Sequence, residues 1–233
     1  MIVSNFRKIL LGAVAGVAAL SAVEAQASTT LPFDFQISDV SGQQHSIATA
    51  ATLEITQLGA NQVGFLLKNL ADTPYDGNLF MSFLMLNYTG SAALTAAAWN
   101  VAAPAGFTLQ AFNTGTFSTG NINQSGYNGF DIQISWPTSG NPNADRFKDH
   151  EYYAWTYTGT GLLESDFLTA IVPNDPNRPG SPTMIHIQGI DGNPTSFKIV
   201  DAPPTQVPEP TSFALAGMAL AGIGFARRRK KHA

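Results

Sequence analysis

The sequence predicts an all-β domain, built as an antiparallel β-sandwich or jelly roll. Apolar and polar residues alternate with a period of two, most clearly over residues 130–136, as in a half-buried strand. Clusters of Gly, Asn, Ser, Thr and Pro, such as residues 138–142 and 173–176, are typical of turns. Helical patterns occur only at residues 91–98 and 162–168, and both are too short to connect parallel strands.

About eight strands are expected from these patterns. Residues 53–55 and 63–67 are predicted to form a hairpin, because the turn residues Gly59, Ala60 and Asn61 separate them. Residues 79–88 are apolar nearly throughout and predict a central strand that is buried on both faces. The other expected strands are 107–112, 130–136, 152–157, 184–190 and 197–200.

The N-terminal segment has the pattern of a secretory signal peptide. Arg7 and Lys8 precede an apolar, alanine-rich run over residues 9–23, and Ala25 and Ala27 supply the small residues that signal peptidase accepts. We therefore expect cleavage before Ser28.

The C-terminal segment has three parts, namely Val207-Pro208-Glu209-Pro210-Thr211, an apolar stretch over 213–226, and five basic residues over 227–231. The prolines predict a stiff, exposed connector. As a helix the apolar stretch would be about 21 Å long, which is shorter than a hydrocarbon core of about 30 Å. This length favours temporary residence in the membrane. The basic end is expected to stay in the cytoplasm, which places the body on the other side.

These three parts resemble the PEP-CTERM sorting signal of Gram-negative bacteria. The resemblance implies that exosortase, a membrane-embedded enzyme, recognises the tail near Pro208, Glu209 and Pro210. It also implies that Arg227, Arg228 and Arg229 belong to the basic end of the signal. All six would then be recognition residues in a substrate.

The expected organisation is a signal peptide over residues 1–27, a β-sandwich domain over 28–203 and a sorting tail with a transmembrane helix over 204–233. Residues 28–206 hold five basic and fourteen acidic residues, a net charge of −9. This acidic balance argues against nucleic acid as a partner. The chain has no cysteine, which excludes disulfides, thiolate metal ligands and a thiol nucleophile.

Two candidate sites follow one another in the sequence. Asn141, Asn143, Asp145, Asp149 and Glu151 form a set of oxygen ligands that could hold calcium, although the set lacks the spacing of an EF-hand and a solvated loop is the alternative. Trp136 and Tyr152 could stack on sugar rings, with Tyr152 expected to be exposed, whereas Tyr153, Trp155 and Tyr157 are expected to pack in the core. His186 is expected on the strand face opposite Ile185 and Ile187.

Three functions remain open at this point. An exported structural or adhesive protein of the cell surface or exopolysaccharide matrix, with no catalytic residues and no required cofactor, is the one we favour. Its expected route passes from signal peptidase, through transient insertion in the inner membrane with the body in the periplasm, to the cell surface or matrix. The second function is a carbohydrate- or calcium-binding module. The third is a secreted hydrolase that uses two carboxylates from Asp145, Asp149, Glu151, Glu164 and Asp166, which would face each other about 5–10 Å apart.

Overall fold

The computed structural model describes residues 28–37, 44–71, 79–138, 146–189 and 196–201. All of them belong to one compact unit, Gln26–Pro208. The predicted signal peptide and sorting tail lie outside the described residues, and so do Ala25, Ala27, Pro208, Glu209, Pro210 and Arg227–Arg229. The described structure therefore does not test cleavage or sorting at these residues, and both stay predictions here.

The described residues form twelve strands and two short 3₁₀ helices, and they contain no α-helix. The elements are β1 (Ser28–Ile37), β2 (Gln44–Gly59), β3 (Gln62–Asn69), β4 (Leu79–Leu86), β5 (Thr95–Ala98), β6 (Thr108–Leu109), η1 (Phe112–Thr114), β7 (Thr116–Gln124), β8 (Tyr127–Ser135), β9 (Phe147–Lys148), β10 (Glu151–Thr158), η2 (Glu164–Phe167), β11 (Thr183–Gly189) and β12 (Ser196–Asp201). No helix in this part of the chain is long and apolar enough to cross a membrane.

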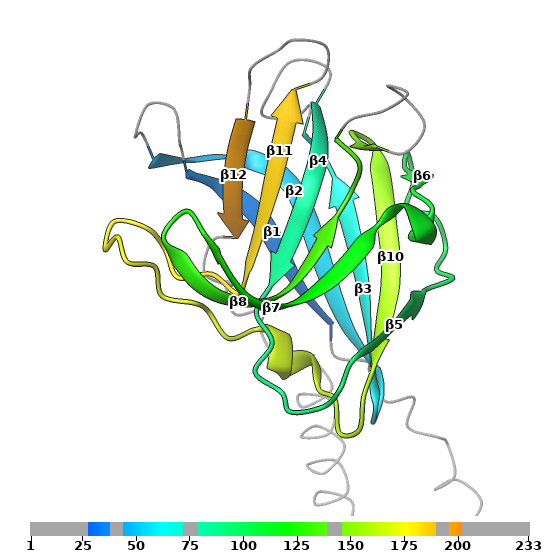
Figure 1. The fold of residues 1–233 in the computed structure, drawn as a ribbon. Helices are drawn as coiled ribbons and strands as arrows, with labels where there is room; N and C mark the ends of the chain where they lie inside the picture. Colours follow the sequence, from blue (N-terminus) through cyan, green and yellow to red (C-terminus); the bar gives the residue numbers. More distant parts are fainter. Residues whose placement is uncertain (1–27, 38–43, 72–78, 139–145, 190–195, 202–233) are drawn as a thin grey trace, which may run out of the picture. The chain divides into compact units, whose positions relative to one another are not determined.

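All of the strands belong to a single sheet (Figure 1). Its order is β5-β10-β3-β2-β1-β12-β11-β4-β8-β7, with β6 beside β10 and β9 beside β4. Every pairing is antiparallel except the two-residue pairing of β6 with β10. The predicted antiparallel all-β class is therefore confirmed. The predicted sandwich takes a different form, because one continuous sheet curls into a half-barrel where two separate sheets were expected.

Aromatic contacts show how far the sheet curls. Phe117 of β7 lies edge-on to Tyr157 of β10, with 6.2 Å between the ring centroids, although these strands are near opposite ends of the strand order. Phe117 also lies 6.5 Å from the ring of Tyr153 on β10. Curling lets a single sheet bury one face against itself, so no second sheet is needed to cover the core.

The sheet has a different core on each face. The inner face holds the large cluster, which draws on β1, β2, β3, β4, β8, β10, β11 and β12. A smaller cluster on the outer face joins Tyr127 and Phe130 of β8 to Met85, Met184 and Val200. A third covers the outer side of β3 and β10, where Trp99, Val101 and Phe107 pack on Tyr152. Strands in the middle of the sheet are buried on both faces for this reason.

The predicted hairpin and central strand are confirmed as β2-β3 and β4. The helix expected at residues 91–98 is wrong, because Thr95–Ala98 form strand β5 against β10. Alanine has the highest helix propensity of all residues, but propensity is a weak determinant, and backbone pairing at a sheet edge outweighs it here. The strand expected at 107–112 shrinks to the two residues of β6, followed by η1. No strand was expected at β7, whose residues are almost all polar.

Both ends of the described chain leave from the same end of the sheet. β1 begins at Ser28 and β12 ends at Asp201, and these strands are antiparallel neighbours, with Asp201 opposite Phe33. The strand ends that flank residues 38–43, 72–78, 139–145 and 190–195 all lie at the opposite end. We call the end of the domain where β1 begins and β12 ends the proximal end, and the opposite end the distal end.

Candidate functional site

The described range divides the predicted calcium loop. Asn141, Asn143 and Asp145 lie outside it, whereas Asp149 and Glu151 lie where β9 turns into β10. Within the described residues, no group of three or more His, Asp or Glu side chains is placed to hold a metal ion. Calcium binding by the five-residue set stays a prediction.

Asp149 and Glu151 have local partners at this turn. The Asp149 carboxylate contacts Nδ1 of His150, which has a positive φ of 55°. Glu151 Oε2 accepts a hydrogen bond from the backbone N–H of Lys148 at 2.7 Å, and burial raises the pKa of Glu151. The two carboxylates therefore stabilise a tight turn, in which the left-handed conformation of His150 reverses the chain.

The prediction that Tyr152 is an exposed ring is wrong. Its exposure is 4% and that of Trp136 is 3%. Alternation along β10 does turn Tyr152 away from the inner core, but Trp99, Val101 and Phe107 cover it there. Trp136 packs edge-on against Tyr153 at 5.2 Å. Neither ring presents a free face on which a sugar could stack.

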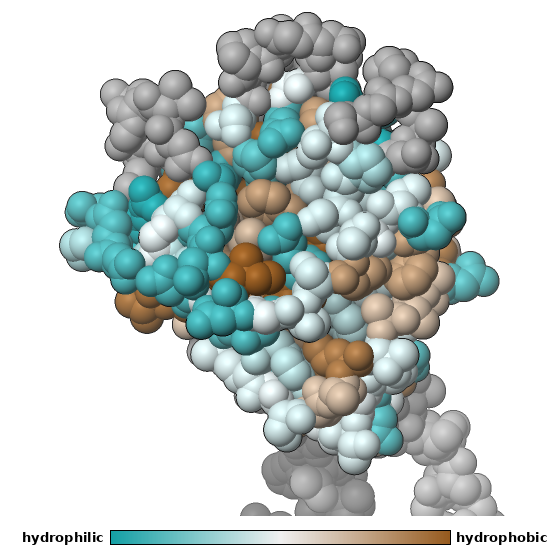
Figure 2. Space-filling model, viewed as in Figure 1, coloured by the Kyte–Doolittle hydropathy of each residue, from teal (hydrophilic) through white to brown (hydrophobic). Residues whose placement is uncertain are grey.

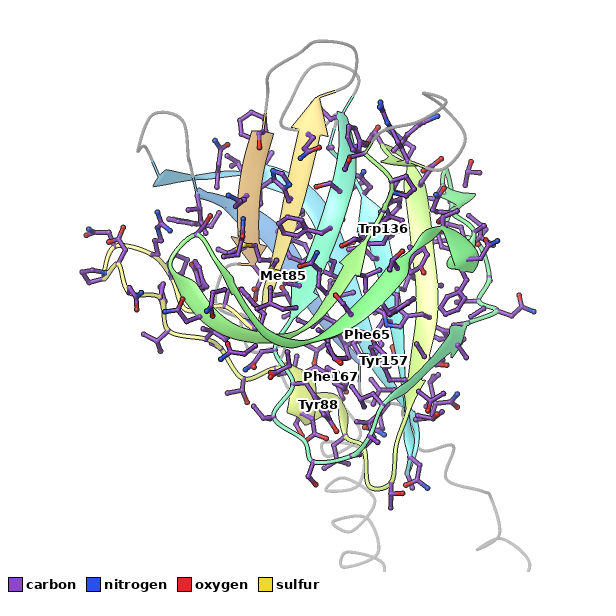
Figure 3. The ribbon with its side chains drawn as sticks, in the orientation of Figure 1. Phe65, Met85, Tyr88, Trp136, Tyr157 and Phe167 are labelled. Carbon is purple, nitrogen blue, oxygen red and sulfur yellow. The ribbon has the colours of Figure 1, made fainter. Side chains whose placement is uncertain are left out.

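The expectation for the other three aromatic residues of β10 is confirmed. Tyr153, Trp155 and Tyr157 are buried in the inner core. Trp155 stacks on Phe65 at 4.9 Å. Figure 3 labels Phe65, Tyr157 and Phe167, whose rings contact one another. Burial raises the pKa of the Tyr153 and Tyr157 hydroxyls above the ordinary value. These rings fill the interior of the half-barrel, so they contribute to the stability of the fold.

The carboxylates expected for a hydrolase lie at two ends of one strand. Asp149 and Glu151 are at the start of β10, whereas Glu164 and Asp166 are on η2, which follows the end of β10. The eight residues of β10 span about 23 Å at about 3.3 Å per residue. That distance is too long for a pair of glycosidase carboxylates, which work about 5–10 Å apart.

Glu164 and Asp166 also have structural partners. Asp166 Oδ2 accepts a hydrogen bond from the backbone N–H of Leu163 at 3.0 Å. Glu164 is 7% exposed. Burial raises its pKa, although hydrogen bonds from Thr29 partly offset this effect. The backbone N–H of Glu164 donates to Gln57 Oε1 at 2.7 Å. Glu164 therefore helps to hold η2 against the proximal ends of β1 and β2, whereas Asp166 caps the start of η2.

His186 belongs to a buried polar cluster that the sequence did not reveal. It lies opposite the core side chains of Ile185 and Ile187, as predicted. Its Nδ1 lies 2.7 Å from Ser82 Oγ and its Nε2 lies 2.7 Å from Ser196 Oγ. Ser82 reaches it because the β4–β11 register shifts at this point, leaving Ser82 without a paired residue on β11. Such bulges re-aim one side chain, and simple alternation cannot locate them.

The two serine hydroxyls that contact the His186 ring are neutral groups. The side-chain amide of Gln188, which is also neutral, lies 3.3 Å from His186 Nδ1. A serine hydrolase would have a carboxylate in the position of Ser196, to stabilise the protonated imidazole. Ser82 is also only 4% exposed. The cluster therefore pairs buried polar groups with one another.

Asp201 is the most deeply buried carboxyl group of the described chain. Its exposure is 0%, and its Oδ1 accepts hydrogen bonds from Ser181 and from Thr183. Its buried Oδ2 has no hydrogen-bond partner among the described residues. Burial raises the pKa of Asp201 to about 7, although the hydroxyl donors lower it. This residue ends β12 at the proximal end, seven positions before Pro208.

Comparison with known proteins identifies the C-terminal segment. The family model of the PEP-CTERM protein-sorting motif matches residues 206–230. No curated protein matches the chain, and no solved structure matches it. The predicted resemblance is therefore confirmed for the tail.

The chain carries the PEP-CTERM sorting motif at its C-terminus, and its body is an antiparallel half-barrel. The motif implies processing by exosortase and export from the cytoplasm. It covers a small part of the chain, so the role of the half-barrel has to be inferred from the domain itself.

Proposed function

We propose that the half-barrel is a structural or adhesive component of the cell surface or of the surrounding exopolysaccharide matrix. The observation that carries the proposal is the sorting motif at residues 206–230. It follows a domain in which the start of β1 and the end of β12 lie toward the same end of the sheet. Release by exosortase near Pro208 would free the domain without disturbing any described strand, since β12 already ends at Asp201. Signal peptidase cleavage before Ser28 would likewise leave β1 whole.

We also propose that the domain acts without catalysis. Two observations support this part. The described carboxylates expected for a hydrolase have partners in turns and at η2, and His186 contacts two serine hydroxyls. The acidic balance of residues 28–206 suits a protein that has to remain soluble outside the cell.

The test of the structural role compares the native host with a deletion strain and with the same strain complemented by the wild-type chain. We expect deletion to increase the fraction of cells that fluid shear removes from a surface, and complementation to restore attachment. We also expect the domain in the polysaccharide fraction. Recovery of the domain in the culture medium, together with unchanged attachment, would contradict the proposal.

The two alternative functions have direct tests on the purified full chain. Reducing ends released from the host exopolysaccharide should not exceed those from heat-denatured protein, and a clear excess would indicate a hydrolase. Calcium titration calorimetry addresses the loop that contains Asp145, Asp149 and Glu151. Heat of binding at millimolar calcium, lost in an Asp145→Asn, Asp149→Asn variant, would favour a calcium-binding module.

A further inference from the structure

The two edges of the sheet lie in a stretch of sequence that has no charge. No Asp, Glu, Lys or Arg occurs from Gly77 to Phe130, although residues 28–206 as a whole are strongly acidic. This stretch contains β5 and β7, the first and last strands of the sheet order. Soluble proteins commonly place charges, especially lysine, or proline on edge strands to prevent pairing with other chains. Neither device occurs in β5 or β7.

The two edges differ in length. β5 has four residues, and a very short edge strand is itself a protection against pairing. β7 has nine residues, pairs with β8 on one side and has no described strand on its other side. Most of its side chains are exposed, including Ser118, Thr119 and Asn121. β7 therefore offers a row of backbone donors and acceptors long enough to bind another strand.

The surroundings of β7 also leave room for a partner. A Cβ atom built on Gly120 would meet no atom of the described residues within 4 Å, and Figure 1 shows β7 at the front of the sheet. Figure 2 shows this face covered mainly by pale and hydrophilic residues, with smaller hydrophobic patches between them. The register between β7 and β8 shifts twice, between Thr119 and Ile122 and between Ile122 and Asn123, so the second half of this edge is irregular. A bulge bends an edge locally but adds no charge repulsion.

We infer that β7 is a self-association edge, at which two copies of this chain pair antiparallel through a twofold axis. Such an axis places the residue on it opposite its own copy, and it places the residues on either side opposite one another, so an edge with charges of one sign would repel itself. β7 contains no charge, and its Thr, Ser, Asn and Gln side chains can hydrogen-bond with their own kind across strands. Two copies of an acidic domain repel each other over most other surfaces, which favours contact through the uncharged edge. This inference goes beyond the proposed function, because it specifies how copies contact one another.

The absence of cysteine makes disulfide crosslinking a clean test. Single substitutions Ser118→Cys, Thr119→Cys, Asn121→Cys and Asn123→Cys would be made in the full chain, with Thr30→Cys and Ala48→Cys as controls. Thr30 and Ala48 are also exposed but lie on β1 and β2, in the interior of the sheet. After mild oxidation, a non-reducing gel should show a dimer severalfold more abundant for at least one β7 variant than for either control. Equal crosslinking of edge and control variants would overturn the inference.

A second variant tests whether the contact depends on an uncharged edge. Thr119→Lys added to the best crosslinking variant at another β7 position should abolish the dimer, whereas Ala48→Lys in the same background should leave it unchanged. Persistence of the dimer in the Thr119→Lys variant, or its loss with both lysine substitutions, would contradict edge pairing. Crosslinking between Ala97→Cys and Asn121→Cys chains, without crosslinking of either alone, would show head-to-tail contact and would also overturn the twofold arrangement. None of these results depends on where the protein is delivered, so delivery and association can fail separately.

Discussion

Strands β4 and β7 lie in the same uncharged stretch, yet they lack charges for different reasons. β4 is apolar, and seven of its eight residues are buried, because the inner core covers one face and the outer cluster covers the other. β7 is polar and mostly exposed, so burial does not explain why it has no charge. The same lack of charge therefore has two meanings in this sheet. In β4 it reflects burial on both faces, whereas in β7 it leaves an exposed edge strand without charged side chains.

The largest difference between the two strands should appear in their stability. Leu84 of β4 has 0% exposure and lies between Ile185 and Ile134. We expect Leu84→Ala to lower the free energy of unfolding by about 2–5 kcal/mol, measured by denaturant titration. Thr119→Ala on β7 is the control and should change it by less than about 0.5 kcal/mol. Similar losses for both would break the comparison.

A buried carboxyl group at the proximal end offers a second test of burial. The pKa of Asp201 is raised to about 7 in the folded protein from about 3.9 in the unfolded chain. The folded state therefore binds more protons, and stability should fall as pH rises from about 4 to above 7. Asp201→Asn should make the free energy of unfolding depend less on pH. It should also raise that free energy near pH 8, by about 1.4 kcal/mol for each unit by which the folded pKa of Asp201 exceeds the unfolded one.

The measurement for Asp201 is the unfolding midpoint in denaturant at several pH values. Asp175→Asn is a suitable control, because Asp175 is partly exposed and lies beside Arg178. An Asp201→Asn profile that keeps the wild-type slope between pH 5 and pH 8 would contradict the assignment.

The buried hydroxyl of Ser82 on β4 should matter more than a similar hydroxyl on β7. Ser82→Ala removes the 2.7 Å contact to His186 Nδ1 inside a buried site, and we expect a loss of about 1–3 kcal/mol. Ser118→Ala removes an exposed hydrogen bond of 3.4 Å to Gln133 and should cost less than about 0.5 kcal/mol. Equal effects in thermal or denaturant unfolding would show that the His186 cluster contributes little.

The smallest stability effect is expected from a change that should strongly affect association. Thr119→Lys places a charge on the exposed edge, and the free energy of unfolding should stay within about 0.5 kcal/mol of the wild type. Sedimentation velocity at low ionic strength should nevertheless show less dimer than in the wild type. A marked loss of stability would mean that Thr119 packs against the domain, contrary to its exposure.

Alternation predicted the strands whose two faces differ clearly in polarity. The β2-β3 hairpin, the core aromatic residues of β10 and the outward face of His186 follow from the sequence for that reason. β7 was missed because Thr, Ser, Asn and Gly dominate both of its faces. β5 was mistaken for a helix because backbone pairing with β10 cannot be read from the alanines themselves.

The candidate site residues were less predictable than the strands. Tyr152 alternates correctly, but the segment from Trp99 to Phe107 that covers it comes from a distant part of the chain. Ser82 and His186 are about a hundred positions apart, and a register shift brings them together. The sorting tail was predictable because its motif is contiguous and needs no tertiary context.

We expect the sorting tail to deliver this chain to the outside of the cell. The most direct measurement is the intact mass and cell fraction of the protein in its native host, for the wild type and for a Pro208→Ala, Glu209→Ala variant. Pro204→Ala, just outside the matched motif, is the control. We predict that the wild type and the control are trimmed at both ends and found outside the cell, while the double variant stays in the inner membrane. A full-length tail in the inner membrane for all three proteins would contradict the account.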